Sequence, residues 1–398
     1  MQGLLDKLHP VFMEDKEGSC AINGTLHQYL SSMKESINDV PEQWDRFKKY
    51  TNPYEFIHTA VPGTKTAVAR ARPLSRSYFK MFEIIKTFGL LDGAPETGMR
   101  TYHIAEGPGG FIEATARMRC NPLDTYYGIT LVDATDSAVP GWKKSGLFLD
   151  EFKNVEIEKG EDGTGDITNP ANLKACYLAH KNAKAELVTA DGGFDFSLAY
   201  NLQETASHKL VFAEVAFALA TQKKGGTFVL KMFDMFTAAS VDIIYILCCL
   251  YDQVNIIKPC TSRYANSERY LVCRGFRLDN TEAIVRGFFK ALGECKNKPD
   301  HNVERFLSCE IPYSLTCAIE DVNAVLGQQQ IETIASTISV ISGIKSDRLE
   351  SMKRANVQRC VTWCQKYKVA HHKGISNSNI FLTRSSEGKN DSGDEDAD

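Results

Sequence analysis

The chain lacks any long apolar segment. Its longest uninterrupted apolar run, Ile243–Tyr251, has nine residues, whereas a membrane-spanning helix needs about 20. The first twenty residues contain scattered charges and no apolar stretch of roughly 7 to 15 residues, which a secretory leader would require. We therefore expect an intracellular protein without a membrane partner.

The twelve cysteines include no C-x-x-C pair, the spacing that is typical of zinc ribbons and small disulfide scaffolds. We expect most of them to be buried apolar residues. One group, Cys360, Cys364, His371 and His372, places four potential metal ligands within thirteen positions. Cysteines four apart on an amphipathic helix usually face the core, so packing is the preferred interpretation, and we assign no metal site.

Acidic charge is concentrated at one end of the chain. From residue 384 onward there are six acids and two bases, which equals the net charge of -4 for the whole protein. We predict a disordered acidic tail at 381–398, because the segment is polar and charged. By contrast, 57–82 contains five bases and no acid. This pattern favours a phosphate-rich partner over a solvated helix face.

Apolar strand-like runs alternate with helical patterns between residues 100 and 276, except that we expect a long loop after the run at 125–132. The alternation predicts an α/β fold with a mostly parallel sheet covered on both faces. The last two runs are too close for a crossover helix, so we expect a terminal antiparallel hairpin, with an edge strand after Glu268. We predict a helical extension at 1–49, a core domain at 50–277 and a helical region at 278–380. The two flanking segments show no motif that indicates a function.

Three glycines, Gly107, Gly109 and Gly110, separate a predicted strand from a predicted helix. Glycine permits a tight turn and close approach of a ligand to the backbone. The third glycine of a dinucleotide fingerprint is replaced by Glu113, so the spacing suits a smaller nucleoside. This argues against a dehydrogenase, which is an alternative class for such a fold.

Two acids follow strand-like runs of the same region, Asp166 in a loop before a helix and Asp191 directly after an apolar strand. Each alone is more typical of a helix cap. Together with the glycine loop they indicate an adenosyl pocket.

Four charged residues lie at the ends of predicted elements: Lys80, Asp191, Lys231 and Glu268. Lys231 ends an apolar strand, where desolvation would lower the pKa of its ammonium group and allow it to act as a base. A charge at a strand end can also simply mark where the strand meets water. That interpretation weakens for four residues that one sheet edge would bring together.

Six motifs occur in one order: SRSYFKMFEI, AEGPGGF, GDIT, TADGGF, FVLKMFD and SRYANSERYLVC. In this order they resemble the FtsJ-like ribose 2'-O-methyltransferases, closest to the branch that methylates the first transcribed nucleotide of capped messenger RNA. The resemblance covers about 50–277. It implies a Rossmann-like methyltransferase fold, S-adenosylmethionine as cofactor, and capped mRNA as partner, with transcription or capping machinery as a further partner class. It favours the nucleus over the cytoplasm.

The resemblance also implies roles for individual residues. Lys231 would take the proton from the ribose 2'-hydroxyl, Lys80 would lower its pKa, and Asp191 and Glu268 would orient the two lysines. The implied cofactor site consists of Gly107, Pro108, Gly109, Gly110, Phe111, Asp166 and Asp191. The implied RNA contacts are Arg76, Tyr200, Asn201, Ser262, Arg263, Asn266 and Ser267, with Tyr200 stacking on the cap guanine and Asn201 reading it.

Two alternatives remain open at this stage. One changes only the substrate, to the second nucleotide of the cap or to uncapped RNA. The other is a non-catalytic RNA-binding or polymerase-accessory module on the same scaffold.

Overall fold

The computed structural model describes residues 2–14, 20–133, 135–136, 139–193, 200–343 and 346–372. The acidic tail predicted at 381–398 lies outside these residues. Among the described helices, none is both long enough and apolar enough to cross a bilayer.

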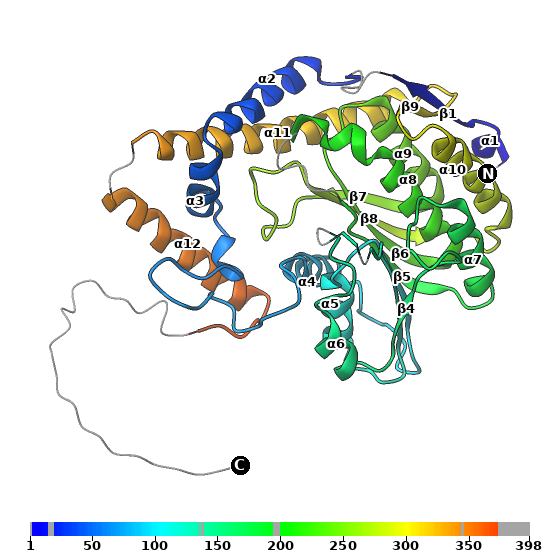
Figure 1. Ribbon diagram of the computed structural model, residues 1–398, viewed down its shortest axis with the longest axis horizontal. Helices are drawn as coiled ribbons and strands as arrows, with labels where there is room; N and C mark the ends of the chain where they lie inside the picture. The colour runs from blue at the N-terminus through cyan, green and yellow to red at the C-terminus, as the bar shows by residue number, and fades with distance from the viewer. Residues whose placement is uncertain are drawn as a thin grey trace, which may run out of the picture.

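A seven-stranded sheet forms the centre of the molecule (Figure 1). Its order is β4-β3-β2-β5-β6-β8-β7, and the first five strands are parallel. The strands are β2 (Arg100–Ile104), β3 (Thr125–Ile129), β4 (Val155–Glu158), β5 (Ala185–Ala190), β6 (Gln222–Met232), β7 (Tyr251–Ile257) and β8 (Arg269–Phe276). The predicted parallel sheet and its antiparallel terminal hairpin are confirmed.

Two details of the sheet differ from the prediction. The strand after Glu268, β8, is not an edge strand, because it pairs with β6 on one side and with β7 on the other. An internal position explains why five consecutive residues from Arg269 are buried. In addition, the short strand β4 forms within the segment that we expected to be a long loop.

Helices cover both faces of the sheet (Figure 1). They are α4 (Ser77–Phe88), α5 (Gly110–Arg119), α6 (Gly146–Glu151), α7 (Pro170–His180), α8 (Gln203–Thr221), α9 (Ala238–Leu250) and α10 (Glu282–Asn297). Successive strand residues point to opposite faces. Accordingly Leu187 packs with α4 and α5, whereas its neighbour Val188 packs with α7 to α10.

The segments before and after the core pack against each other. They comprise α1 (Gln2–Leu5), β1 (Leu8–Met13), α2 (Gly24–Glu35), η1 (Ser36–Asp39), α3 (Pro41–Thr51), η2 (Glu55–Ile57), β9 (Asn302–Leu307), α11 (Tyr313–Ile341) and α12 (Ser346–Lys366). Strand β1 pairs with β9 in an antiparallel sheet, and α11 lies beside α2 and α3 (Figure 1). The N-terminal segment is therefore not purely helical.

A buried ionic cluster joins these flanking segments to the core. Asp234, which follows β6, accepts hydrogen bonds from Lys34 of α2 at 2.5 Å and from Arg269 of β8 at 3.2 Å. Arg269 also donates to Asn323 of α11. All four side chains are buried. Since buried charges are costly unless paired, this cluster fixes α2 and α11 next to the end of β6.

Candidate active site

The four charged residues singled out in the sequence lie together at the carboxyl edge of the parallel strands. Asp191 follows β5 and Lys231 is near the end of β6. Strand β8 runs antiparallel to β6, with Tyr270 opposite Lys231. The start of β8, and Glu268 before it, therefore reach the same edge. Lys80, on the first turn of α4, completes the group, which we call the catalytic cluster.

Hydrogen bonds connect the members of the catalytic cluster. Lys80 Nζ donates to Glu268 Oε2 at 2.6 Å. Lys231 Nζ donates to the main-chain oxygen of Asp191 at 2.7 Å and lies 3.3 Å from Asp191 Oδ1. Tyr270 links the two pairs, because its hydroxyl donates to Asp191 Oδ1 at 2.8 Å and accepts from Lys80 Nζ at 3.3 Å. Sequence reasoning missed Tyr270, although it lies two residues after Glu268 on the same strand face.

The two lysines differ in their electrostatic surroundings. Burial lowers the pKa of Lys80 more than Glu268 and Asp191 raise it. Burial also acts to lower the pKa of Lys231, but Asp191, Glu268 and Glu214 raise it more, so the net pKa of Lys231 is raised. The prediction of a lowered pKa for Lys231 is therefore wrong. Desolvation at the strand end is real, but three carboxyl groups surround the same amine.

Glu268 is held in its charged form. Burial would raise the pKa of Glu268, but Lys80, Lys231 and Arg76 together hold it well below its usual range. Its other oxygen accepts a hydrogen bond from Ser262 Oγ at 2.7 Å. Glu268 is thus a fixed anion between the two lysines and the polar loop before β8.

The glycine loop lies at the same edge, between β2 and α5, but protein atoms account for its glycines. A Cβ on Gly110 would lie 2.0 Å from Ser77 Oγ, and one on Gly107 would lie 2.6 Å from the main-chain oxygen of Gly141. Gly109 has φ 105°, a conformation that favours glycine. We expected the absence of side chains at these glycines to leave room for a ligand. The contacts show instead that neighbouring segments of the chain fill the space beside Gly107 and Gly110.

Two other residues of the expected cofactor site have defined contacts. Phe111 is fully buried and packs against Tyr270, with 5.8 Å between ring centroids. Its side chain therefore belongs to the core, and only its main chain can contact a ligand. Pro108 follows a cis peptide bond, and its carbonyl accepts a hydrogen bond from Ser145 at 2.6 Å.

Asp166 lies in the loop between β4 and α7. This loop is held against the end of β3, because a Cβ on Gly165 would lie 2.0 Å from the main-chain oxygen of Thr130. Asp166 Oδ1 accepts hydrogen bonds from the main chain and hydroxyl of Thr168, at 2.9 and 2.7 Å. The helix cap of α7 is Asn169, not Asp166. Asp166 is half-buried.

The loop before β8 places most of the expected RNA-contacting residues beside the catalytic cluster. Arg263 pairs with the buried Glu55 at 2.6 Å. Lys258, which sequence reasoning did not single out, donates to the main-chain oxygens of Asn266 and Glu268 at 2.7 and 2.8 Å. Burial lowers the pKa of Lys258 to about 7. Lys258 thus shapes the loop that carries Arg263 and Asn266, which are partly exposed, and Ser262 and Ser267, which are buried.

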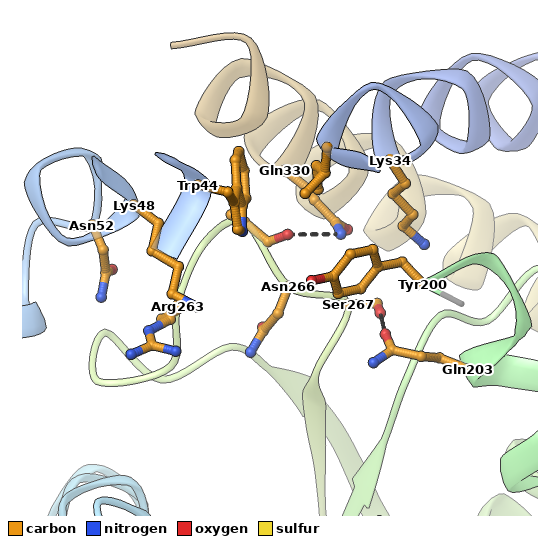
Figure 2. Close-up of a pocket in the computed structure, with 12 residues that line it drawn as sticks. Lys34, Trp44, Lys48, Asn52, Tyr200, Gln203, Arg263, Asn266, Ser267 and Gln330 are labelled. Carbon is orange, nitrogen blue, oxygen red and sulfur yellow. Dashed lines mark hydrogen bonds between the residues drawn. The ribbon is translucent and has the colours of Figure 1, made fainter. Parts of the chain in front are cut away.

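A pocket of about 140 Å³ lies next to this loop, and we call it the flanking pocket. Figure 2 shows that helices from both flanking segments form part of its wall. The side chains that line it are Lys34, Ile37, Trp44, Lys48, Asn52, Tyr200, Gln203, Arg263, Ala265, Asn266, Ser267 and Gln330. The pocket therefore combines two aromatic rings with basic and amide side chains.

Tyr200 and Asn201 occupy different places although they are adjacent. Tyr200 lines the flanking pocket. The side-chain amide of Asn201 donates instead to Glu35 Oε1 at 3.2 Å and to the main-chain oxygen of Ser31 at 3.4 Å. Asn201 is thus fastened to α2 and is not one of the lining residues.

The basic stretch 57–82 divides into two parts. Lys65, Arg70 and Arg72 are exposed. Lys80 belongs to the catalytic cluster, and Arg76 interacts electrostatically with Glu55 and Glu268. The stretch therefore leads from the surface into the site.

The Cys360, Cys364, His371 and His372 group does not gather into one site in the described residues. Both cysteines are buried in the core around α4 and α12, which confirms the packing interpretation, and His371 forms an isolated β-bridge with Ala69.

A different group, made of residues outside the catalytic cluster, does bring ligand-type side chains together. Glu158, Cys176 and His180 have ligand atoms within 4.8 Å of one another. Glu158 accepts hydrogen bonds from His180 at 2.7 Å and from Tyr102 at 2.6 Å, so these side chains satisfy one another.

Comparisons with known proteins agree with this site. The family model described as FtsJ-like methyltransferase matches residues 73–276. The chain is 33% identical over 276 residues to cap-specific mRNA (nucleoside-2'-O-)-methyltransferase 1 of Mus musculus, covering 67% of this chain and 32% of that protein. It is 36% identical over 230 residues to the protein of the same name from Trypanosoma cruzi, covering 54% of this chain and 60% of that protein.

A third relative carries the same name with the number 2 in place of 1. Cap-specific mRNA (nucleoside-2'-O-)-methyltransferase 2 of Danio rerio is 32% identical over 281 residues, covering 63% of this chain and 35% of that protein. The chain spans about a third of the length of the vertebrate relatives that it matches. The matched region includes all four members of the catalytic cluster. The chain belongs to the FtsJ-like methyltransferase family.

Proposed function

We propose that this chain transfers a methyl group from S-adenosylmethionine to the ribose 2'-hydroxyl of the first transcribed nucleotide of capped mRNA. The observation that supports this most directly is the catalytic cluster. Two lysines and two carboxylates from separate elements meet at the carboxyl edge of the sheet, where ligands of open α/β folds bind. A site that serves only for RNA binding would not need two buried ammonium groups beside two carboxylates, one of them buried.

The residues at this edge fit S-adenosylmethionine. The loop after β2, the Asp166 loop after β4 and the carboxylate of Asp191 after β5 lie at the ends of strands that are close in the sheet. Carboxylates there can accept hydrogen bonds from ribose hydroxyls, an exocyclic amine or an ammonium group. S-adenosylmethionine supplies an electrophilic methyl group on a sulfonium sulfur, so the protein mainly aligns the reacting atoms and excludes water.

The residues of the catalytic cluster have separable roles. Lys231, in its neutral form, accepts the proton of the ribose 2'-hydroxyl. Asp191 orients Lys231 through its main-chain and side-chain oxygens, and Glu268 holds Lys80. Because the pKa of Lys231 is raised, its amine is protonated near neutral pH. The neutral form becomes more abundant as pH increases. The rate of methyl transfer should therefore rise with pH.

The flanking pocket provides a place for the cap guanine. A methylated guanine is positively charged and favours stacking on aromatic faces. Tyr200, together with the edge of the mostly buried Trp44 that lines the pocket, supplies an aromatic surface, and Gln203 and Asn266 supply amide groups for hydrogen bonds. Ser267 lines the pocket and directly precedes Glu268. A base bound in the pocket would thus place the first nucleotides next to the catalytic cluster. Trp44 is a contact that sequence reasoning missed.

The relatives leave the position of the methylated nucleotide as the main alternative. The zebrafish protein is named as the second methyltransferase of the pair. The flanking pocket favours a capped substrate over uncapped RNA. All four members of the catalytic cluster are present and paired, which argues against a non-catalytic RNA-binding module. A capped substrate implies transcription or capping machinery as partners and the nucleus as the compartment.

The decisive test uses tritiated S-adenosylmethionine and short RNAs that differ only in their 5' ends. The set has an N7-methylated cap, an unmethylated cap or a 5'-triphosphate, with an optional preformed methyl group on the first ribose. We expect label at the first nucleotide of the capped RNAs after nuclease digestion. Label at the second nucleotide, or equal labelling of the triphosphate RNA, would overturn the proposal.

A further inference from the structure

One peptide group lies between two buried ionisable side chains. The peptide between Asp191 and Gly192 accepts a hydrogen bond from Lys231 Nζ at its carbonyl oxygen, at 2.7 Å. Its N–H donates to Glu214 Oε1 at 2.8 Å. In a trans peptide the C=O and the N–H point in opposite directions. Lys231 and Glu214 therefore hold this peptide from its two sides.

The glycines of the turn make this arrangement possible. A Cβ on Gly192 would lie 2.3 Å from Glu214 Oε1, and a Cβ on Gly193 would lie 3.1 Å from Lys231 Nζ. Any other residue at position 192 would displace the Glu214 carboxyl group. The Gly-Gly pair thus permits a carboxyl group behind the turn and an amine in front of it.

Glu214 has no other evident purpose in the core. It lies on α8, is completely buried, and faces the turn from beneath. Its second oxygen, Oε2, has no hydrogen-bond partner among the described residues. A buried carboxyl group with one free oxygen is destabilising in itself. Its one hydrogen bond among the described residues is to the peptide that also accepts a hydrogen bond from Lys231.

We propose that Glu214 is a positioning residue for Lys231, acting through the Asp191–Gly192 peptide. The carboxyl group fixes the peptide plane, and the carbonyl on the opposite side then fixes the amine that accepts the proton. This inference rests on the proposed function, in which Lys231 is the base. It adds a residue from a helix that contributes nothing else to the catalytic cluster.

The charges around the two side chains define the expected pH dependence. Glu214 faces Lys231, Asp191 and Glu106. Lys231 faces Asp191, Glu268 and Glu214, and it also interacts with Lys80. Burial raises the pKa of Glu214 to about 8. Glu214 is therefore mostly neutral at pH 7, and above pH 8 its negative charge raises the pKa of Lys231.

Two substitutions in the full chain distinguish two effects of Glu214: its hydrogen bond, which fixes the position of Lys231, and its charge, which raises the pKa of Lys231. Glu214→Gln keeps an oxygen that can accept from the Gly192 N–H but cannot ionise. We expect kcat at pH 7 within about threefold of the wild type, and the rising limb of the kcat–pH profile displaced to lower pH by about half a unit. Glu214→Leu removes the acceptor. We expect kcat to fall about 30-fold with KM for RNA nearly unchanged, since the amine is no longer held in place.

Glu204→Gln is the matched control, because Glu204 is a buried carboxyl group on the same helix that accepts hydrogen bonds from Phe236 and Thr237. Its kcat–pH profile should coincide with that of the wild type. A Glu214→Gln profile that coincides with the wild type, or a Glu214→Leu variant with wild-type kcat, would overturn the proposal.

A readout independent of methyl transfer distinguishes this inference from the proposed function. The labelling of Lys231 by a small amine-reactive reagent is followed against pH by mass spectrometry. Lys231 should react at lower pH in Glu214→Gln than in the wild type. If the wild type methylates no RNA while this shift is present, the proposed function fails and the pairing of Glu214 with Lys231 stands. If the labelling curves coincide, the pairing itself is wrong.

Discussion

The catalytic cluster and the flanking pocket are adjacent, yet they are built from different parts of the chain. All four members of the catalytic cluster lie within residues 73–276, which match the family model. Half of the residues that line the flanking pocket lie outside that range, namely Lys34, Ile37, Trp44, Lys48, Asn52 and Gln330. Under the proposed function, the family core supplies the chemistry, and the flanking helices complete the pocket that we propose for the cap.

The two regions also differ in how their charges are balanced. In the catalytic cluster, buried lysines pair with carboxylates of the same cluster, the buried Glu268 and the half-buried Asp191. In the flanking pocket, each basic side chain pairs with an acid of the surrounding framework, as Lys34 does with Asp234 and Arg263 with Glu55. The charges thus pair within the site in one region and with the surrounding framework, which positions the pocket walls, in the other.

The largest expected effect is at the catalytic cluster. Lys231→Ala should lower kcat about 10³-fold, because it removes the group that accepts the proton. Binding of S-adenosylmethionine, measured by calorimetry, should change little. Lys184→Ala is the control, since this half-buried lysine precedes β5 at the opposite end of the strand from Asp191. Full activity of Lys231→Ala would show that another group accepts the proton.

The next effect is on the cofactor. Asp166→Ala should weaken the binding of S-adenosylmethionine about 30-fold, since a hydrogen bond to a charged group is worth about 1.5 to 3 kcal/mol. Isothermal calorimetry measures it directly. Glu161→Ala, an exposed acid of the same loop, should bind like the wild type. Equal affinities of the two variants would remove Asp166 from the site.

A smaller effect is expected in the flanking pocket. Trp44→Ala should raise KM for capped RNA about tenfold, because stacking of a base on an aromatic ring contributes about 1 to 3 kcal/mol. The kcat value and the KM for triphosphate RNA should be nearly unchanged. Tyr29→Ala, at an exposed position on α2, serves as the control. An equal loss on capped and uncapped RNA would mean that the pocket does not select the cap.

The smallest effect concerns the exposed part of the basic stretch. Replacing Arg70 and Arg72 with glutamine should weaken RNA binding only a few-fold at 0.1 M salt and reduce the slope of log K against log salt by about 1.4. Fluorescence anisotropy at several salt concentrations measures both. Lys223→Gln with Lys224→Gln, at the start of β6, should leave the slope unchanged. An unchanged slope in the arginine variant would place the RNA elsewhere.

Much of the catalytic cluster could be predicted from sequence because parallel strands share one carboxyl edge. Asp191 and Lys231 each end an apolar run, so their proximity follows from the alternation of strands and helices. The position of β8 inside the sheet could not be predicted in this way, because pairing of distant strands depends on contacts across the whole sheet. The burial of Phe111 and the packing of Ser77 against Gly110 depend on α4, which precedes the sheet in the chain.

The sequence by itself determined the α/β alternation, the residues at the strand ends and the resemblance to a methyltransferase family. These depend on local patterns and on residue types at fixed spacing. Only the tertiary structure decided the direction of the pKa shift of Lys231, the position of Glu214 behind the Gly192 turn and the position of Trp44 in the flanking pocket. Each of these depends on side chains that are close in space but far apart in the chain, and burial and Coulomb interactions act through space.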